Sequence, residues 1–143
     1  MTAPDYRAAP LKAATRRMVI ETSRRLVTYE ALRDIVYVGL GAKEYVDFEM
    51  MFEALGVRQM VSIESKIPRE RLEYNRPYRQ IKVETGTTND CLPHISQLTE
   101  QPSIVWLDYT STLNQDVYTD LAYLGATVLP GSAIFITLNA HFS

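Results

Sequence analysis

A pair of glycines follows the first strongly apolar run of the chain, in the segment Gly39-Leu40-Gly41-Ala42. A glycine has no Cβ, so the backbone can turn sharply there and a ligand can approach it closely. A helical pattern begins directly after this segment, and the first N–H groups of a helix lack partners within the helix. The pattern predicts either a ligand-binding loop or a tight turn from a strand into a helix.

Glu64 ends the second apolar run, 23 residues after Gly41. This is close to the spacing of about 20 residues at which an acidic side chain accepts hydrogen bonds from a ribose. A carboxylate suits two neighbouring hydroxyls because it has two acceptor oxygens. Glu64 is thus predicted to bind a nucleoside sugar. The alternative is a surface glutamate at the end of a strand.

Three more polar residues follow the next two apolar runs. Asp90 lies in the turn after the third run, where it could accept a hydrogen bond from an adenine amino group or cap a helix. Asp108 and Tyr109 directly follow the fourth run. Asp108 could orient a nucleophile or act as a base, and Tyr109 could stack on a planar ligand. The alternative for Asp108 is a side chain that caps the next turn.

Strand and helix patterns alternate along the chain, and their order predicts how these residues are positioned. The apolar runs predicted as strands are Ile35–Val38, Met60–Ile63, Ile81–Val83, Ser103–Leu107 and Ala133–Leu138. Because helices separate the strands, they are expected to pair in parallel through right-handed crossovers. The predicted fold is an α/β, Rossmann-like three-layer sandwich with a mainly parallel five-stranded sheet. Ligands of such sheets bind at the carboxyl ends of the strands.

The first predicted helix runs from Leu11 to about Val27. Its apolar residues fall at steps of three and four, which predicts that they share one buried face. These residues are Leu11, Ala14, Met18, Thr22 and Leu26.

Later helices have clearer ends. A helix over residues 44–55 is expected to stop at Gly56, where a C-cap glycine belongs. Another short helix is expected to follow Asp90 and to run through Leu98. The last helix is predicted to begin after Asn114 and to carry Val117, Leu121 and Leu124.

Composition limits the class of protein. The chain has 143 residues, of which 46% are apolar and 22% charged, with a formal net charge of -2. These values predict one globular domain, 11–143, after a flexible lead-in, 1–10. No apolar run is long enough to cross a membrane, and no signal peptide is visible. The single cysteine, Cys91, favours a cytoplasmic setting.

The charges are unevenly distributed along the chain. Residues 1–33 carry seven Lys or Arg against three Asp or Glu, whereas residues 83–143 carry six acids and no Lys or Arg. Either the C-terminal stretch is mostly buried, or it faces a partner or a further domain.

Together these residues resemble class I S-adenosylmethionine-dependent methyltransferases. The segment Val36-Tyr37-Val38-Gly39-Leu40-Gly41 is similar to their first motif, and Leu107-Asp108-Tyr109 stands where their fourth motif lies. The resemblance implies that the two glycines, Glu64 and Asp90 bind S-adenosylmethionine, Glu64 at the ribose and Asp90 near the adenine. It also implies that Asp108 and Tyr109 meet the methyl acceptor.

A closer resemblance, over nearly the whole chain from about Leu11, is to uncharacterised bacterial proteins labelled putative O-methyltransferases. The stretches that carry it are Arg16-Arg17-Met18, 37–41, Asp47-Phe48, Ala54-Leu55-Gly56, 60–64, 74–78 and 103–109. The implied function is a methyltransferase that binds S-adenosylmethionine, with an acceptor that the sequence does not identify.

The chain departs from the superfamily pattern in three ways. Tyr37 stands where the first motif usually has an acid, and Lys43 or Glu44 replaces the third glycine. The full fold has seven strands, and the chain ends five residues after Leu138. It is therefore either a segment of a longer protein or a domain whose fifth strand is an edge. We expect a partner subunit, a second copy or the rest of a parent protein to cover that edge.

Other functions stay open. The domain could be a non-catalytic module of a larger assembly that binds a protein or a nucleic acid. Nucleic acid could bind Arg69, Arg71, Arg76 and Arg79, which alternate with tyrosines. A dinucleotide oxidoreductase also fits the glycine pair and Glu64. No set of residues with the spacing of a catalytic metal site is visible, and the lone His94 and His141 are expected to be structural.

Overall fold

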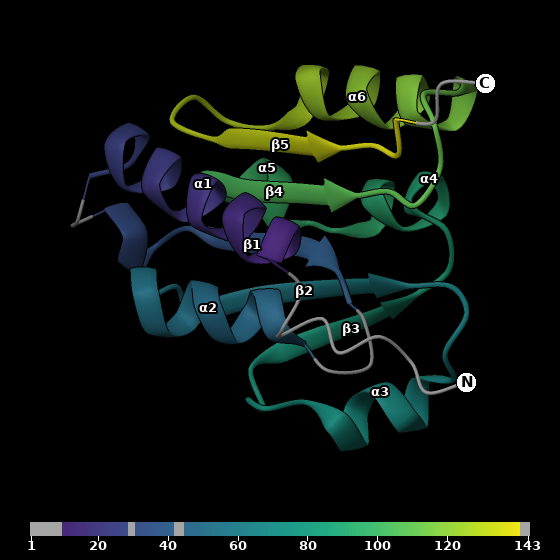
Figure 1. The fold of residues 1–143 in the computed structure, drawn as a ribbon, viewed down its shortest axis with the longest axis horizontal. Coiled ribbons are helices and arrows are strands. Elements are labelled where there is room, and N and C mark those ends of the chain that lie inside the picture. The colour runs from purple at the N-terminus through teal and green to yellow at the C-terminus, as the bar shows by residue number, and fades with distance from the viewer. Residues whose placement is uncertain (1–9, 29–30, 42–44, 141–143) are drawn as a thin grey trace.

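The computed structural model describes residues 10–28, 31–41 and 45–140. The five predicted strands form one sheet in the order β3-β2-β1-β4-β5, and every pair is parallel (Figure 1). Their bounds are β1 Val36–Leu40, β2 Gln59–Glu64, β3 Ile81–Thr85, β4 Ser103–Asp108 and β5 Ala133–Thr137. The Rossmann-like α/β fold is confirmed. The predicted lead-in lies, except for its last residue, outside the described residues.

Helices connect successive strands. Their bounds are α1 Pro10–Leu26, α2 Val46–Leu55, α3 Arg69–Asn75, α4 Thr88–Cys91, α5 Gln97–Glu100 and α6 Gln115–Thr127, with 3-10 turns η1 Ala31–Arg33 and η2 Leu92–His94. Gly56 caps α2 in the left-handed region, at φ 70°. The Asn114 side chain accepts a hydrogen bond from the backbone N–H of Val117. Both predicted helix ends are therefore confirmed.

The single helix predicted after Asp90 is wrong, because α4, η2 and α5 divide this segment. Pro93 lies at the start of η2. A proline has no N–H to donate, and its ring collides with the carbonyl four residues earlier. An α-helix cannot continue through it without a kink, so the chain changes direction there.

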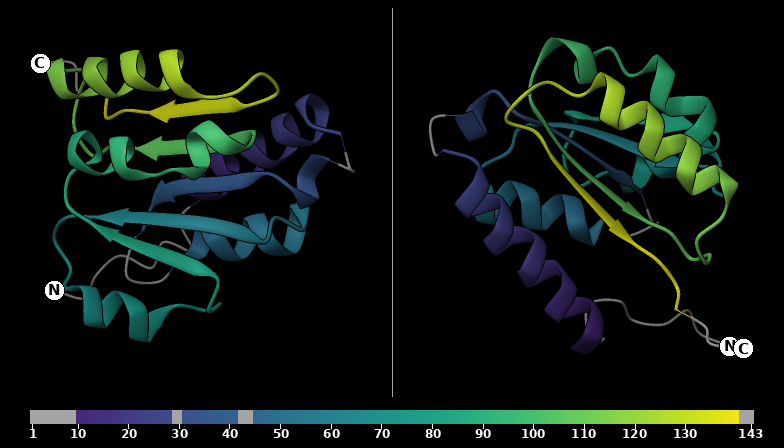
Figure 2. Two further views of the ribbon diagram at one scale, coloured as in Figure 1. Left: turned by 180° about the vertical axis from the view of Figure 1, so that it is seen from behind. Right: turned by 90° about the horizontal axis from the view of Figure 1, so that it is seen from above.

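Helices cover both faces of the sheet (Figure 2). On one face α1, α2 and α3 pack around a cluster that includes Tyr37, Met60 and Trp106. On the other face α4, α5 and α6 pack around a cluster that includes Val38 and Leu107. Neighbouring residues of a strand point to opposite faces, so each inner strand contributes to both clusters.

The buried face of α1 differs from the predicted one. The buried residues are Arg16, Val19, Ile20 and Ser23. In contrast, Leu11, Met18 and Leu26 are 86%, 69% and 64% exposed. An ion pair of 2.6 Å between Arg16 and Asp47 of α2 holds the helix in this rotation. The predicted face was wrong because the periodicity of apolar residues gives no sign that a charged residue such as Arg16 is buried in an ion pair.

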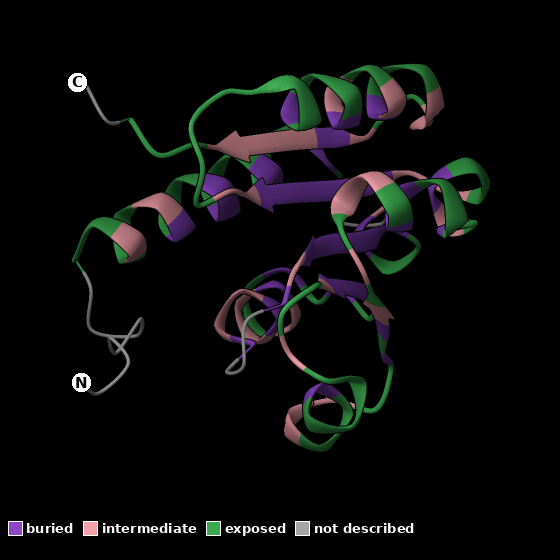
Figure 3. Ribbon diagram, turned by 90° about the vertical axis from the view of Figure 1, so that its right-hand side faces the viewer, coloured by how far each residue is buried: buried purple, intermediate pink, exposed green. Residues whose placement is uncertain are grey.

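The two edges of the sheet are finished differently. At the β3 edge, Arg76 donates to the carbonyl of Ile81 at 2.9 Å and Arg69 donates to the carbonyl of Val83 at 2.7 Å. At the other edge, β5 is only half-buried beyond its first residue (Figure 3). Within the described residues, the outward backbone groups of β5 have no hydrogen-bond partner. Among the described helices none is long and apolar enough to span a membrane.

Candidate functional site

A cavity of about 870 Å³ opens at the carboxyl ends of the strands. It lies where the strand order reverses between β1 and β4, which is the usual ligand site of such sheets. The segments that line it are 40–41, 45–48, 63–66, 86–89, 108–111, 114, 116–117 and 138–139, together with Lys12 and Arg16 of α1. The expected position of the site and the observed cavity therefore coincide.

Gly41 and Glu64 line this cavity from neighbouring strands. The backbone N–H of Gly41 donates to the carbonyl of Ile63 at 3.0 Å, which joins the end of β1 to the end of β2. Glu64 Oε1 accepts from the backbone N–H groups of Ser65 at 3.0 Å and Lys66 at 2.8 Å. These bonds hold the carboxylate beside the cavity, and Oε2 has no hydrogen-bond partner within the described residues.

Gly39 lies inside β1 and does not line the cavity. A Cβ at this position would lie 2.5 Å from the Tyr37 hydroxyl oxygen, because the tyrosine ring covers the glycine. Tyr37 is 1% exposed and makes an edge-to-face contact with Phe48, with ring centroids 5.0 Å apart. The structure therefore explains this glycine by packing. The three residues after Gly41, which include Lys43 and Glu44, fall outside the described residues.

The Asp90 side chain is hydrogen-bonded to the N-cap residue of α4, Thr87. Its carboxylate accepts from the Thr87 hydroxyl at 2.8 Å, and its backbone N–H donates back to that hydroxyl oxygen at 3.2 Å. Asp90 does not line the cavity, whereas its neighbours Thr88 and Asn89 do. Binding of an adenine by Asp90 stays a prediction, and Asn89 is a lining residue to which the sequence reasoning gave no role.

Asp108 lines the cavity with both carboxylate oxygens engaged. Oδ2 forms an ion pair with the Lys12 ammonium, and Oδ1 accepts from the Thr137 hydroxyl. The Lys12 ammonium also lies 5.8 Å from the ring centroid of Trp106. Burial lowers the pKa of Lys12. Asp108 thus joins α1 to the ends of β4 and β5.

Tyr109 follows Asp108 and also lines the cavity. Its hydroxyl donates to Asp120 Oδ2 at 2.5 Å. Burial, followed by this hydrogen bond, raises the pKa of Tyr109 well above its usual value. The phenol is therefore neutral at physiological pH and can stack or donate a hydrogen bond, but it cannot serve as a base there.

Asp120 is a second residue that sequence reasoning missed. It lies on the inward face of α6 with Val117 and Leu124, where Leu121 had been predicted instead. Its carboxylate is buried, at 1% exposed, and accepts from Tyr109, Thr88 and Asn89. The available signal was spacing, because Asp120 stands three residues after Val117 and four before Leu124.

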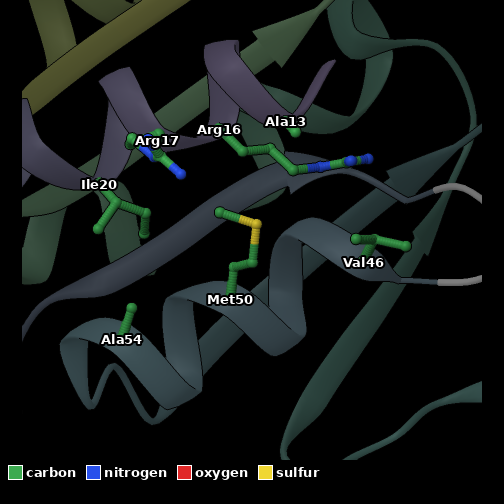
Figure 4. Close-up of a pocket in the computed structure, with 7 residues that line it drawn as sticks. All are labelled: Ala13, Arg16, Arg17, Ile20, Val46, Met50 and Ala54. Carbon is green, nitrogen blue, oxygen red and sulfur yellow. The ribbon is translucent and has the colours of Figure 1, made fainter. Parts of the chain in front are cut away.

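A smaller cleft of about 390 Å³ lies on the outer side of α1 and α2 (Figure 4). It is lined by apolar residues of both helices and by Arg16 and Arg17. Arg16 also lines the large cavity, and its guanidinium pairs with Asp47 at 2.6 Å. The ion pair therefore stands between the cleft and the cavity.

The arginines proposed for nucleic-acid contact lie around α3. Two of them, Arg69 and Arg76, use their guanidinium groups on the carbonyls of β3. Arg71 and Arg79 have exposed side chains. Nucleic-acid binding through this segment stays a prediction, with fewer free cations than the sequence indicated.

Metal ligands do not gather in the part of the chain that the structure describes, where no group of three His, Cys, Asp or Glu side chains could hold an ion. His94 is exposed at the end of η2. His141 lies outside the described residues.

A family model described as "Putative O-methyltransferase" matches residues 4–143. The chain belongs to this family. The matched region contains all of the residues that line the cavity. A search of curated proteins found no match.

Proposed function

We propose that this member of the family transfers a methyl group from S-adenosylmethionine to an oxygen of its acceptor. The observation that carries the proposal is the position of the cavity, which lies over the carboxyl ends of β1, β2 and β4 with Gly41 and Glu64 on its rim. A volume of about 870 Å³ is ample for a nucleoside with an amino-acid tail and leaves space for part of an acceptor.

The chemistry of the lining residues fits this cofactor. Glu64 Oε2 would accept from the ribose hydroxyls, since Oε1 is already held by backbone N–H groups. Thr88 and Asn89 would face the base in place of the predicted Asp90, which bonds to Thr87 instead. The cofactor supplies a methyl group activated by a positively charged sulfur.

The acceptor would bind beside Asp108 and Tyr109. Near-attack positioning of two reactants supplies several kcal/mol of a barrier of this kind, so these residues need only orient the acceptor. Tyr109 would do so as a neutral phenol, because its pKa is raised. Asp108, which pairs with Lys12, would receive the proton that the acceptor loses.

Calorimetry with S-adenosylhomocysteine tests the cofactor site. We expect the wild-type protein to bind it and Glu64→Ala to bind about 1.5–3 kcal/mol more weakly, the loss of a charge-assisted hydrogen bond. Glu70→Ala is the matched control, because Glu70 is exposed on α3 and does not line the cavity. No heat with the wild-type protein would contradict the proposed function. An unchanged affinity in Glu64→Ala would remove Glu64 from the site.

We also propose that the β5 edge pairs with β5 of a second copy. Arginines cap the β3 edge, whereas the outward backbone groups of β5 lack partners in the described part of the chain. A molecule with one open edge can form a closed two-fold pair but not an extended fibre.

A further inference from the structure

We propose that Asp120 is a positioning residue of the candidate site. It holds three cavity-lining side chains in place and does not touch the ligand itself. The inference rests on the proposed function, because the ligand is the proposed cofactor. Its evidence is the set of hydrogen bonds that the Asp120 side chain accepts. The three side chains are Thr88, Asn89 and Tyr109. All three line the cavity, and Asp120 does not.

A buried carboxylate is costly unless donors replace its lost hydration. Asp120 is 1% exposed, and the described residues place no cation against it. Two hydroxyls and one amide compensate the charge instead: Oδ2 accepts from Thr88 and Tyr109, and Oδ1 accepts from Asn89 at 2.8 Å. The same position would bury a leucine at lower cost, so the carboxylate is explained by what it holds.

The donors come from two separate walls of the cavity. Thr88 and Asn89 open α4 after β3, and Tyr109 follows β4. These walls are far apart in the sequence; α6 contacts α4, and its Asp120 accepts hydrogen bonds from both walls. Asp120 therefore joins them at one point, and a movement of either wall requires a buried hydrogen bond to break.

The orientation of the Asn89 amide follows from its partners. Its nitrogen donates to Asp120 Oδ1 at 2.8 Å and to the carbonyl of Asp116 at 3.0 Å. Both partners can only accept, so the nitrogen must face them. The amide oxygen accepts no hydrogen bond within the described residues. Asp120 thereby presents Asn89 to the cavity as an acceptor and Tyr109 as a fixed, neutral ring.

The test replaces Asp120 with asparagine, which keeps the size and one acceptor oxygen and removes the charge. Two readouts are needed. The first is the ultraviolet titration of Tyr109, isolated by subtracting the Tyr109→Phe protein. The second is calorimetric affinity for S-adenosylhomocysteine, measured well below the unfolding temperature. Glu100→Gln is the matched control, because Glu100 is exposed on α5 and away from the cavity.

We expect Asp120→Asn to lower the pKa of Tyr109, since a carboxylate hydrogen bond keeps the phenol protonated. Affinity should fall about tenfold, the effect of one hydrogen bond to a charged group. A fall in thermal stability with unchanged affinity would overturn the inference, because the role would then be structural. An unchanged Tyr109 titration would also overturn it. If the wild-type protein binds no S-adenosylhomocysteine, the proposed function fails, and the titration alone decides whether Asp120 holds Tyr109.

Discussion

Gly39 and Gly41 stand two residues apart, yet different contacts require them. Gly41 lines the cavity, and a Cβ there would lie 1.8 Å from the Ser62 hydroxyl oxygen. Gly39 lies beneath the ring of Tyr37, in the place where a ligand-binding glycine had been predicted. At the scale of the residue, packing against a neighbouring side chain therefore accounts for both glycines, and only Gly41 also lines the cavity.

Gly39→Ala should destabilise the protein by about 1–3 kcal/mol, the usual cost of forcing extra volume into a packed core. The Tyr37 ring cannot move away easily, because it is buried against Phe48. Denaturant unfolding measures the change. Gly125→Ala is the control: it lies in α6 with no atom within 4 Å of its added Cβ, and alanine should stabilise the helix by up to about 1 kcal/mol. Equal stabilities for the two variants would contradict the packing role.

At the scale of the element, α1 is positioned by charged side chains as much as by apolar ones. Arg16 pairs with Asp47 of α2, and Lys12 pairs with Asp108 at the end of β4. Beyond Arg16, the apolar residues Val19 and Ile20 belong to the core cluster on this face of the sheet. The helix thus closes one side of the cavity while its exposed leucines and methionine face away.

Arg16→Ala should lower the free energy of unfolding by about 3 kcal/mol, because it leaves the partly buried Asp47 carboxylate without its cation. Met18→Ala, two residues along the same helix, should change stability by no more than about 0.5 kcal/mol, because Met18 is 69% exposed. Thermal unfolding of the two variants distinguishes the observed helix face from the predicted one. A larger loss for Met18→Ala would show that the predicted stripe is buried in solution.

At the scale of the whole molecule, the proposed pairing depends on the open β5 edge. Thr137 accepts from Tyr109 on the β4 side, so the alternate residues Ile134 and Ile136 direct their backbone groups outward. The β3 edge offers no equivalent surface, because arginines cover its carbonyls.

Sedimentation equilibrium of the wild-type protein should show a dimer whose fraction rises with concentration. Ile134→Pro removes one outward N–H, which an edge strand tolerates, and should give a monomer with an unchanged circular dichroism spectrum. Ile134→Val keeps the N–H and should still dimerise. A wild-type protein that stays monomeric at every concentration would contradict pairing through β5.

The order and type of the elements could be predicted from the sequence, because the periodicity of apolar residues and the cap residues are local signals. This local information was sufficient for the parallel sheet, for Gly56 and Asn114 as caps, and for the placement of Gly41, Glu64, Asp108 and Tyr109 at one end of the sheet. Pro93 was the local signal that the prediction of one long helix failed to use.

The partners of the site residues were decided only by the tertiary structure. Asp108 is bonded to Lys12, 96 positions earlier, and Asp120 gathers donors from positions 11 to 32 residues away. No local periodicity encodes such contacts, because they depend on which faces of distant helices and strands meet. The chain by itself determined that chemistry-bearing residues collect at the carboxyl ends of the strands. Folding determined which of them face the cavity and which are held by other side chains, because a charged group that becomes buried is costly unless hydrogen bonds or an opposite charge compensate it.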